Sequence, residues 1–301
     1  MPRALAVAAC AVTMFAGGWC HVASAAPLMP ARLAAVDDAV RQAQSDPALV
    51  GAHIGVAVLD PSGGTLLYGH DADGAYIPAS TLKLLTAATG LSVLGSGFRP
   101  RTLLQAAGAI HNGVLDGTLY LVGGGDPLLA ESDLATAAAA LRVAGVTEIR
   151  SLAVDQSAFS GSPYGDGWSW EDLAAYYAPP ITALALEENA LDVDVMPGAS
   201  AGAPATVRVE EAYGAPFFQD DATTGPSGSP PTADCHLAPD ASSVRVSGSV
   251  PLGGATVRQG CAVLDPSAFA AAALAGALQA HGVRVDALAG VEPAPRDART
   301  V

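Results

Sequence analysis

The hydrophobic pattern of the first hundred residues predicts a helix, a strand pair and a second helix. Apolar residues recur at helical spacing over residues 31–48, with charged residues between them. Residues 53–60 and 65–68 are β-like runs on either side of a Pro/Gly-rich connection, which is typical of an antiparallel hairpin. The apolar run over residues 80–94 predicts a helix that ends at Gly95.

After about residue 99 the pattern changes to short β-like runs separated by turns. Helical runs at about 132–144 and 267–282 interrupt it, and no internal repeat is present. Residues 214–240 are rich in Pro, Ser, Gly and Thr, which predicts a long surface loop or a flexible joint. The short β-like runs cover residues 119–122, 149–154, 191–195, 206–209 and 244–250. The chain therefore divides into an α/β opening and a longer β-rich segment.

Composition narrows the class of partner. The 301 residues are about half hydrophobic, so the chain can bury a sizeable core. It carries 29 acidic and 14 basic residues, for a formal net charge of -15. This charge argues against nucleic acids and anionic membrane surfaces as partners.

The N-terminus indicates export. Residues 1–25 carry one early positive charge at Arg3, then mostly small and apolar residues, and end in the small-residue sequence Ala23-Ser24-Ala25. This pattern predicts a secretory signal peptide cleaved after Ala25, and hence an extracytoplasmic protein of the cell envelope or medium. An uncleaved anchor is the alternative, but the apolar run is shorter than the roughly 20 residues that a span needs. No later segment could span a membrane.

Signal cleavage leaves two cysteines, Cys235 and Cys261. In an exported chain such a pair is more often a disulfide than a metal site. His236 beside Cys235 suggests zinc, but no CxxC or HExxH spacing supports it. We therefore expect a disulfide, no metal and no cofactor.

Candidate chemistry centres on Ser80 and Lys83, the single lysine of the chain. Residues i and i+3 share a helix face, so Lys83 would reach the hydroxyl of Ser80 in the first turn of the helix. Apolar neighbours would favour a neutral amine, which can act as a base for a serine nucleophile, whereas arginine cannot deprotonate. The alternative is that Ser80 is an N-cap and Lys83 is solvated, since S-x-x-K alone is a weak motif.

The sequence around the S-x-x-K motif is similar to that of a known group of enzymes. The sequence IPASTLKLLTAATGL (77–91) resembles the active-site helix of penicillin-recognising serine enzymes. It is most similar to the class C low-molecular-mass penicillin-binding proteins, which are D-alanyl-D-alanine carboxypeptidases and endopeptidases. The resemblance runs from about Leu33 to the C-terminus. Further matches follow in order: GTLYLVGGGDPLL (117–129), VDQSAFSG (154–161), GWSWEDLAAYYAPPITAL (167–184) and ENALDVDVMPG (188–198).

The resemblance implies a mixed α+β or α/β, multi-domain fold, in which a large β-rich insert interrupts a β-lactamase-like transpeptidase domain. Four segments are expected. They are a signal peptide (1–25), the N-terminal part of the transpeptidase-like domain (26–98), the inserted β-rich region (99–286) and a re-entry into the transpeptidase-like domain (287–301).

The resemblance also implies roles for three residues. Ser80 would be the nucleophile and supply one backbone N–H of the oxyanion hole, and Lys83 would be its base. Asp172 would meet the free amine of the diaminopimelate side chain, although a surface residue or a residue at a helix N-terminus is the alternative. The implied partners are peptidoglycan stem peptides ending in D-Ala-D-Ala, with β-lactams as covalent inhibitors.

Two further family motifs, S-x-N and K-T-G, are absent from the 301 residues. Asn112 and Asn189 lie in other contexts, and the single lysine is already assigned. The sequence therefore predicts a C-terminally truncated copy that is inactive or impaired. The competing hypothesis is a non-catalytic exported protein that binds peptidoglycan or a partner, while a β-lactamase is disfavoured by the large insert.

Overall fold

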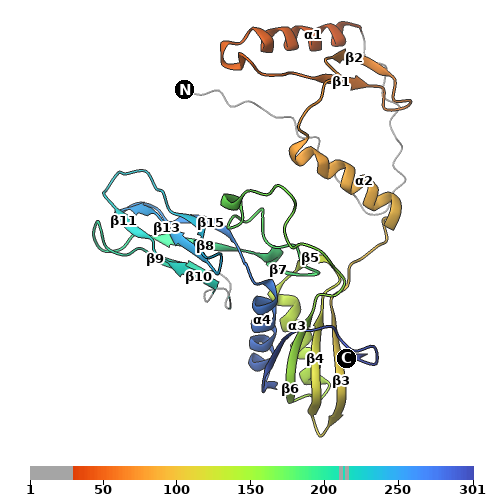
Figure 1. The fold of residues 1–301 in the computed structure, drawn as a ribbon, viewed down its shortest axis with the longest axis vertical. Coiled ribbons are helices and arrows are strands. Elements are labelled where there is room, and N and C mark those ends of the chain that lie inside the picture. Colours follow the sequence, from red (N-terminus) through yellow and green to blue (C-terminus); the bar gives the residue numbers. More distant parts are fainter. Residues whose placement is uncertain (1–29, 210–212, 214–216) are drawn as a thin grey trace. The chain divides into compact units, whose positions relative to one another are not determined.

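The computed structural model describes residues 30–209, 213 and 217–301, which divide into two compact units between Ser96 and Gly97 (Figure 1). The predicted signal peptide lies outside the described residues. Within them, no helix has the length and apolar character needed to cross a bilayer. The predicted domain boundaries stay predictions.

The first unit follows the predicted order of helix, hairpin and helix. The strands pair antiparallel with Val56 opposite His70, and the Tyr68 hydroxyl donates to Asp37 Oδ1 at 3.0 Å, which ties the hairpin to the first helix. Among the described hydrophobic residues of this unit, only Val40 is buried. Its elements are α1 (Pro30–Ser45), η1 (Pro47–Leu49), β1 (Val56–Leu59), β2 (Leu66–His70), η2 (Ala79–Thr81) and α2 (Leu82–Leu94).

The second unit is built on a six-stranded mixed sheet with strand order β16-β6-β4-β3-β18 and with β17 also paired to β6. A two-residue turn at Asn112 and Gly113, with φ of 50° and 83°, joins β3 to β4 as an antiparallel hairpin. Helix α3 connects β4 to the parallel strand β6. The elements are β3 (Leu103–His111), β4 (Val114–Val122), α3 (Glu131–Val143), β6 (Glu148–Asp155), α4 (Pro266–Ala280), β16 (Arg284–Val285), β17 (Leu288–Val291) and β18 (Arg299–Thr300).

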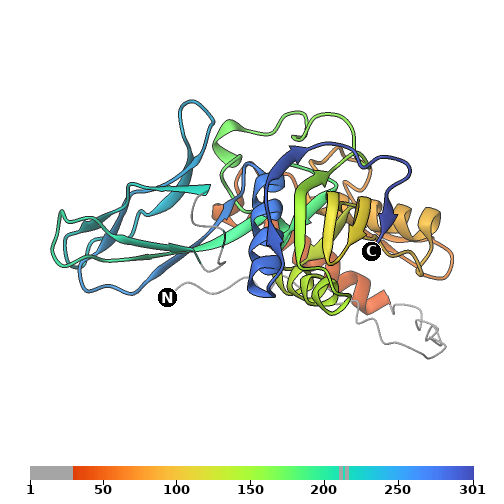
Figure 2. The ribbon, with the colours of Figure 1, turned by 90° about the horizontal axis from the view of Figure 1, so that it is seen from below.

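Helices α3 and α4 pack against each other and share a hydrophobic core with this sheet (Figures 1 and 2). The second half of strand β6 is covered on both faces, because the adjacent residues Leu152 and Ala153 are each 0% exposed, whereas Arg150 in the first half is exposed. Residues 152–154 accordingly form a short apolar run, as parallel strands buried on both faces do. The mixed α/β class expected from the sequence is confirmed.

A second group of short strands surrounds a smaller core that includes Val193, Val195, Val246 and Cys261. Its central pairs are β8 with β15 and β8 with β9, all antiparallel. The remaining elements are β5 (Asp126–Leu129), η3 (Trp170–Asp172), β7 (Leu184–Leu186), η4 (Glu187–Asn189), β8 (Ala190–Met196), β9 (Thr206–Val209), β10 (Phe218–Asp220), β11 (Thr223–Gly225), β12 (Asp234–Leu237), β13 (Val244–Ser247), β14 (Ser249–Pro251) and β15 (Val257–Ala262).

Two sequence predictions in this region are wrong. Residues 214–240 are not simply a loop, because they contain β10, β11 and β12; β10 and β11 pair in parallel with strands further along the chain. The run 244–250 is not one strand, because Gly248 adopts φ 99° and divides it into β13 and β14. A Cβ at Gly248 would lie 2.2 Å from the Thr232 carbonyl oxygen, so this break requires glycine.

The segment 287–301 pairs with the sheet of the second unit. Strand β17 lies along β6, and β18 places Arg299 and Thr300 opposite Ala106 and Gln105 of β3. The end of β6 is tied to this segment by Asp155, whose carboxylate accepts from the backbone N–H groups of Ser157 and Ala294, both at 2.8 Å.

In the smaller core, Cys235 of β12 and Cys261 of β15 form a disulfide with their Cα atoms 5.9 Å apart. The two positions are separated by 26 residues along the chain. Both cysteines are buried, so the disulfide lies inside the smaller core and links two of its strands covalently.

We expect replacement of both cysteines by alanine to lower the free energy of unfolding by about 3 kcal/mol, because the loop that the bridge closes becomes free in the unfolded chain. Urea denaturation followed by circular dichroism measures the change. The wild-type chain under a reducing agent is the control and should lose a similar amount. Equal midpoints for the oxidised and reduced chain would contradict a stabilising bridge.

Asp155 gives the fold a dependence on pH. Burial alone would raise the pKa of the Asp155 carboxyl, but hydrogen bonds from the Ser157 hydroxyl and from the backbone N–H groups of Ala294 and Ser157 outweigh burial and lower the pKa. A carboxyl whose pKa is lower in the folded state stabilises the fold above its unfolded pKa. That contribution is lost as the pH falls through the folded pKa.

We expect Asp155→Asn to destabilise the chain by about 1–3 kcal/mol at neutral pH, because the amide nitrogen cannot accept one of the two N–H groups. The difference from wild type should begin to shrink as the pH falls below about 4, where the unfolded-state carboxyl becomes protonated, and should shrink further as the pH falls through the lower folded pKa. Urea midpoints across a pH series test this. Asp297→Asn, at an exposed carboxylate in the same C-terminal segment, is the matched control and should leave the midpoints unchanged. A constant difference at every pH would contradict the role of the Asp155 charge.

Candidate active site

The predicted nucleophile and base lie side by side in the first unit. Ser80 belongs to the short turn η2, and Lys83 belongs to the first turn of α2. Lys83 Nζ donates to Ser80 Oγ at 3.0 Å. This distance permits direct proton transfer between the hydroxyl and a neutral amine, which is the geometry that a serine nucleophile and its base require.

The backbone before Ser80 is unusual. Ala79 adopts φ 44°, in the left-handed region that disfavours residues with a Cβ. Such a residue costs about 1 kcal/mol or more, and residues of this kind cluster at functional sites. Thr81 stabilises the turn, because its backbone N–H donates to the Pro78 carbonyl at 3.0 Å and its hydroxyl donates to the same oxygen. No sequence signal indicated this conformation at an alanine.

The apolar surroundings expected for Lys83 are not found among the described residues. Ser80 and Lys83 are exposed, and Leu82, Leu84 and Leu85 are 52%, 75% and 64% exposed. Adjacent residues of a helix point in different directions, so apolar sequence neighbours need not surround a side chain. Helix α2 contains no buried residue.

Asp172 belongs to the second unit, whereas Ser80 and Lys83 belong to the first. It ends the short turn η3, and its Oδ1 accepts a hydrogen bond of 2.6 Å from the hydroxyl of Tyr177. This hydrogen bond is the largest cause of a pKa of Tyr177 above its ordinary value, and burial adds to it. The sequence analysis missed Tyr177, because a tyrosine five residues from an acid carries no recognisable signal.

The segment that follows Asp172 is anchored to strand β15. Ala174 is fully buried, and its carbonyl accepts from the Ala262 N–H at 2.9 Å. The Tyr176 N–H donates to the Gly260 carbonyl at 3.2 Å. A Cβ at Gly260 would lie 2.9 Å from the Tyr176 Cβ, so the close approach depends on glycine. Because Cys261 lies between these two contacts, the disulfide supports the same strand.

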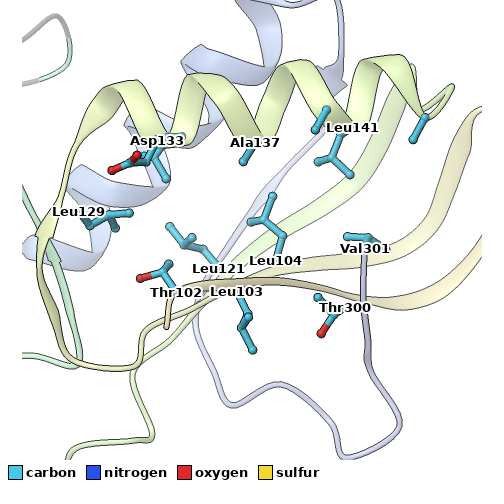
Figure 3. A pocket seen from close by; sticks show the side chains of 13 residues that line it. Thr102, Leu103, Leu104, Leu121, Leu129, Asp133, Ala137, Leu141, Thr300 and Val301 are labelled. Carbon is cyan, nitrogen blue, oxygen red and sulfur yellow. The ribbon is translucent and has the colours of Figure 1, made fainter. Parts of the chain in front are cut away.

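A separate pocket of about 490 Å³ lies in the second unit between α3 and strands β3 and β4 (Figure 3). Leu104, Leu121 and Leu141 point into it, and Asp133 and Thr102 lie at one end. None of the predicted site residues lines it. Within the part of the chain that the structure describes, no group of three or more His, Cys, Asp or Glu side chains could hold a metal ion.

Comparison with known proteins places these features in a family. The chain is 34% identical over 276 residues to a D-alanyl-D-alanine carboxypeptidase of Actinomadura sp. (strain R39), covering 89% of this chain and 51% of that protein. It therefore spans about half the length of that relative.

Two solved structures resemble the fold. Penicillin-binding protein 4 (dacB) from Haemophilus influenzae matches with a TM-score of 0.71 and 25% identity, over 82% of this chain and 55% of that one. The same protein complexed with a novel β-lactam matches with a TM-score of 0.62 and 20% identity, over 79% and 51% of the two chains. Residues 36–301 match the D-Ala-D-Ala carboxypeptidase 3 (S13) family, and the chain belongs to that family.

Proposed function

We propose that this chain carries the acylation site of a serine-type D-Ala-D-Ala carboxypeptidase or endopeptidase that acts on peptidoglycan outside the cytoplasm. The observation that carries the proposal is the 3.0 Å hydrogen bond between Lys83 Nζ and Ser80 Oγ at the start of α2. Family membership over residues 36–301 and the relative's description as a D-alanyl-D-alanine carboxypeptidase support it.

In the proposed reaction, Ser80 Oγ attacks the carbonyl carbon of the penultimate D-Ala while its proton passes to the Lys83 amine, which can accept it only when uncharged. For this step the hydrogen bond between the two groups runs in the opposite sense, with the Ser80 hydroxyl as donor and the Lys83 nitrogen as acceptor. Collapse of the tetrahedral intermediate breaks the C–N bond, and the terminal D-Ala leaves with a proton. Water then hydrolyses the ester on Ser80 and releases the shortened peptide.

The position of Ser80 at a helix start supports its second role. The first N–H groups of a helix lack partners within it and carry the positive end of the helix dipole. The Ser80 N–H would therefore stabilise the oxyanion that forms on the carbonyl oxygen. The family motifs S-x-N and K-T-G, which would assist the leaving group and supply the other oxyanion donor, are not among the 301 residues. We therefore propose that acylation by this chain is slow.

Asp172 is proposed to recognise the substrate rather than to perform chemistry. A carboxylate suits the ammonium group on the side chain of a peptidoglycan stem peptide, and the Asp172 carboxylate forms no ion pair among the described residues. β-Lactams are proposed as covalent ligands of Ser80, since the related penicillin-binding protein 4 has been solved with one.

We expect the purified chain to form a covalent adduct with a fluorescent penicillin, with a gain in intact mass equal to that of the whole drug, because opening the lactam ring releases no leaving group. Ser80→Ala should give no adduct. Lys83→Arg keeps the positive charge but cannot deprotonate, so its labelling rate should fall at least about a hundredfold.

The labelling rate and the intact mass together test whether Ser80 is the acylated residue. An adduct that persists in Ser80→Ala would place the reactive group elsewhere. A folded wild-type chain that never labels would contradict the proposed site in this chain and favour the non-catalytic, peptidoglycan-binding alternative.

A further inference from the structure

Residues 151–207, which include Asp172, contain acidic side chains but no basic ones. Between Arg150 and Arg208 the sequence contains no lysine, arginine or histidine. The same stretch carries eight carboxylates: Asp155, Asp166, Glu171, Asp172, Glu187, Glu188, Asp192 and Asp194. Arg258 of β15 pairs with Asp192 and Asp194, and the other six carboxylates of the stretch favour a cation over an anion as a ligand.

Within this stretch, the acidic side chains accept hydrogen bonds from different kinds of donor. Asp155 accepts two backbone N–H groups, and Asp194 accepts from Arg258 at 2.9 and 3.2 Å. The Glu171 carboxylate accepts from the Ser169 hydroxyl beside it. The Asp172 carboxylate accepts only from the Tyr177 hydroxyl among the described residues, and only through Oδ1. Its second oxygen is left to accept from a ligand.

The hydrogen bond between Tyr177 and Asp172 fixes the direction of that second oxygen. A 2.6 Å bond from a hydroxyl to a carboxylate is charge-assisted and among the stronger kinds. Both residues sit on backbone anchored by the buried Ala174 and by strand β15, so the bond joins two fixed points. A partly exposed Asp side chain without this partner would rotate among its rotamers.

We propose that Tyr177 is a positioning residue that holds the Asp172 carboxylate ready to bind a primary ammonium group on the ligand. The inference rests on the proposed function, because it deepens the role assigned to Asp172 there. Tyr177 acts through Asp172 and makes no contact with the reacting atoms. It raises the affinity for ligands with a free side-chain amine and leaves the affinity for ligands without one unchanged.

The adjacent tyrosine supplies a matched control. Tyr176 and Tyr177 are 63% and 61% exposed. Their rings pack edge to face, with the ring centroids 5.3 Å apart. The Tyr176 hydroxyl makes no hydrogen bond to the residues that the structure describes, in contrast to that of Tyr177. Replacing either by phenylalanine keeps the ring and removes one hydroxyl. Only the Tyr177 change removes the hydrogen bond to Asp172.

The experiment measures binding of two tripeptides by calorimetry in a Ser80→Ala background, which prevents turnover. The probes are Nα-acetyl-lysyl-D-alanyl-D-alanine and the same peptide acetylated at Nε. We expect the chain to prefer the free amine and Tyr177→Phe to reduce that preference about three- to tenfold, with Tyr176→Phe unchanged. Asp172→Asn should abolish the preference, and adding Tyr177→Phe to it should change nothing further.

A second readout reports the hydrogen bond itself. The ultraviolet titration of Tyr177, obtained as wild type minus Tyr177→Phe, should shift to lower pH in Asp172→Asn, because the charged acceptor of the phenol proton is gone. A preference for the free amine that survives Tyr177→Phe intact would overturn the proposal. So would an equal loss of affinity for both peptides, or a wild-type chain with no preference.

The outcomes separate this inference from the proposed function. Penicillin labelling of Ser80 does not involve a side-chain amine, so a labelled chain with an unchanged preference in Tyr177→Phe would refute only the role of Tyr177. An unlabelled chain that still loses its preference in Tyr177→Phe would refute only the acylation site.

Discussion

The second unit depends on the burial of strand β6. Its apolar residues are sealed between the neighbouring strands and helix α4, with Ile149, Leu152 and Val154 at most 1% exposed. Shortening one of them to alanine would cost about 2–5 kcal/mol, a large part of the stability of a domain. Strands β16, β17 and β4 pair with β6, and β3 pairs with β4, so the register of these four strands depends on the position of β6. The turn at Asp155 and the strand pairings of the C-terminal segment follow from the same placement.

The sequence predicted elements whose signals are local. The helices at α1, α2, α3 and α4 and the first hairpin follow from apolar spacing and from Gly or Pro at their ends. The strands β10 and β11 could not be predicted in this way. Each has only three residues, and each is formed by parallel pairing with a strand further along the chain. A local composition of Pro, Ser, Gly and Thr carries no information about such partners.

In the candidate site, too, the sequence predicted the features that follow from local spacing and missed those that depend on backbone turns. The spacing of Ser80 and Lys83 on a helix placed their side chains together, and the hydrogen bond agrees with that spacing. The left-handed Ala79 and the Tyr177 hydroxyl on Asp172 arise from backbone turns whose geometry no residue pattern fixed. The exposure of Lys83 shows the limit of arguing from sequence neighbours, since burial depends on which elements cover a helix.

The pairing of β15 with the segment after Asp172 has a consequence for the order of assembly. The segment 174–176 is complete long before its support, because the residues that hold it, 260–262, follow much later in the chain. Contacts between such distant residues form slowly, since a long loop must close first. When the chain is synthesised from its N-terminus, the turn that carries Asp172 and Tyr177 is made before β15. It gains its backbone hydrogen bonds to residues 260–262 only after β15 has been synthesised. The conformation of the segment that carries Asp172 and Tyr177 is therefore fixed late in folding, when Cys261, the partner of Cys235, is also present.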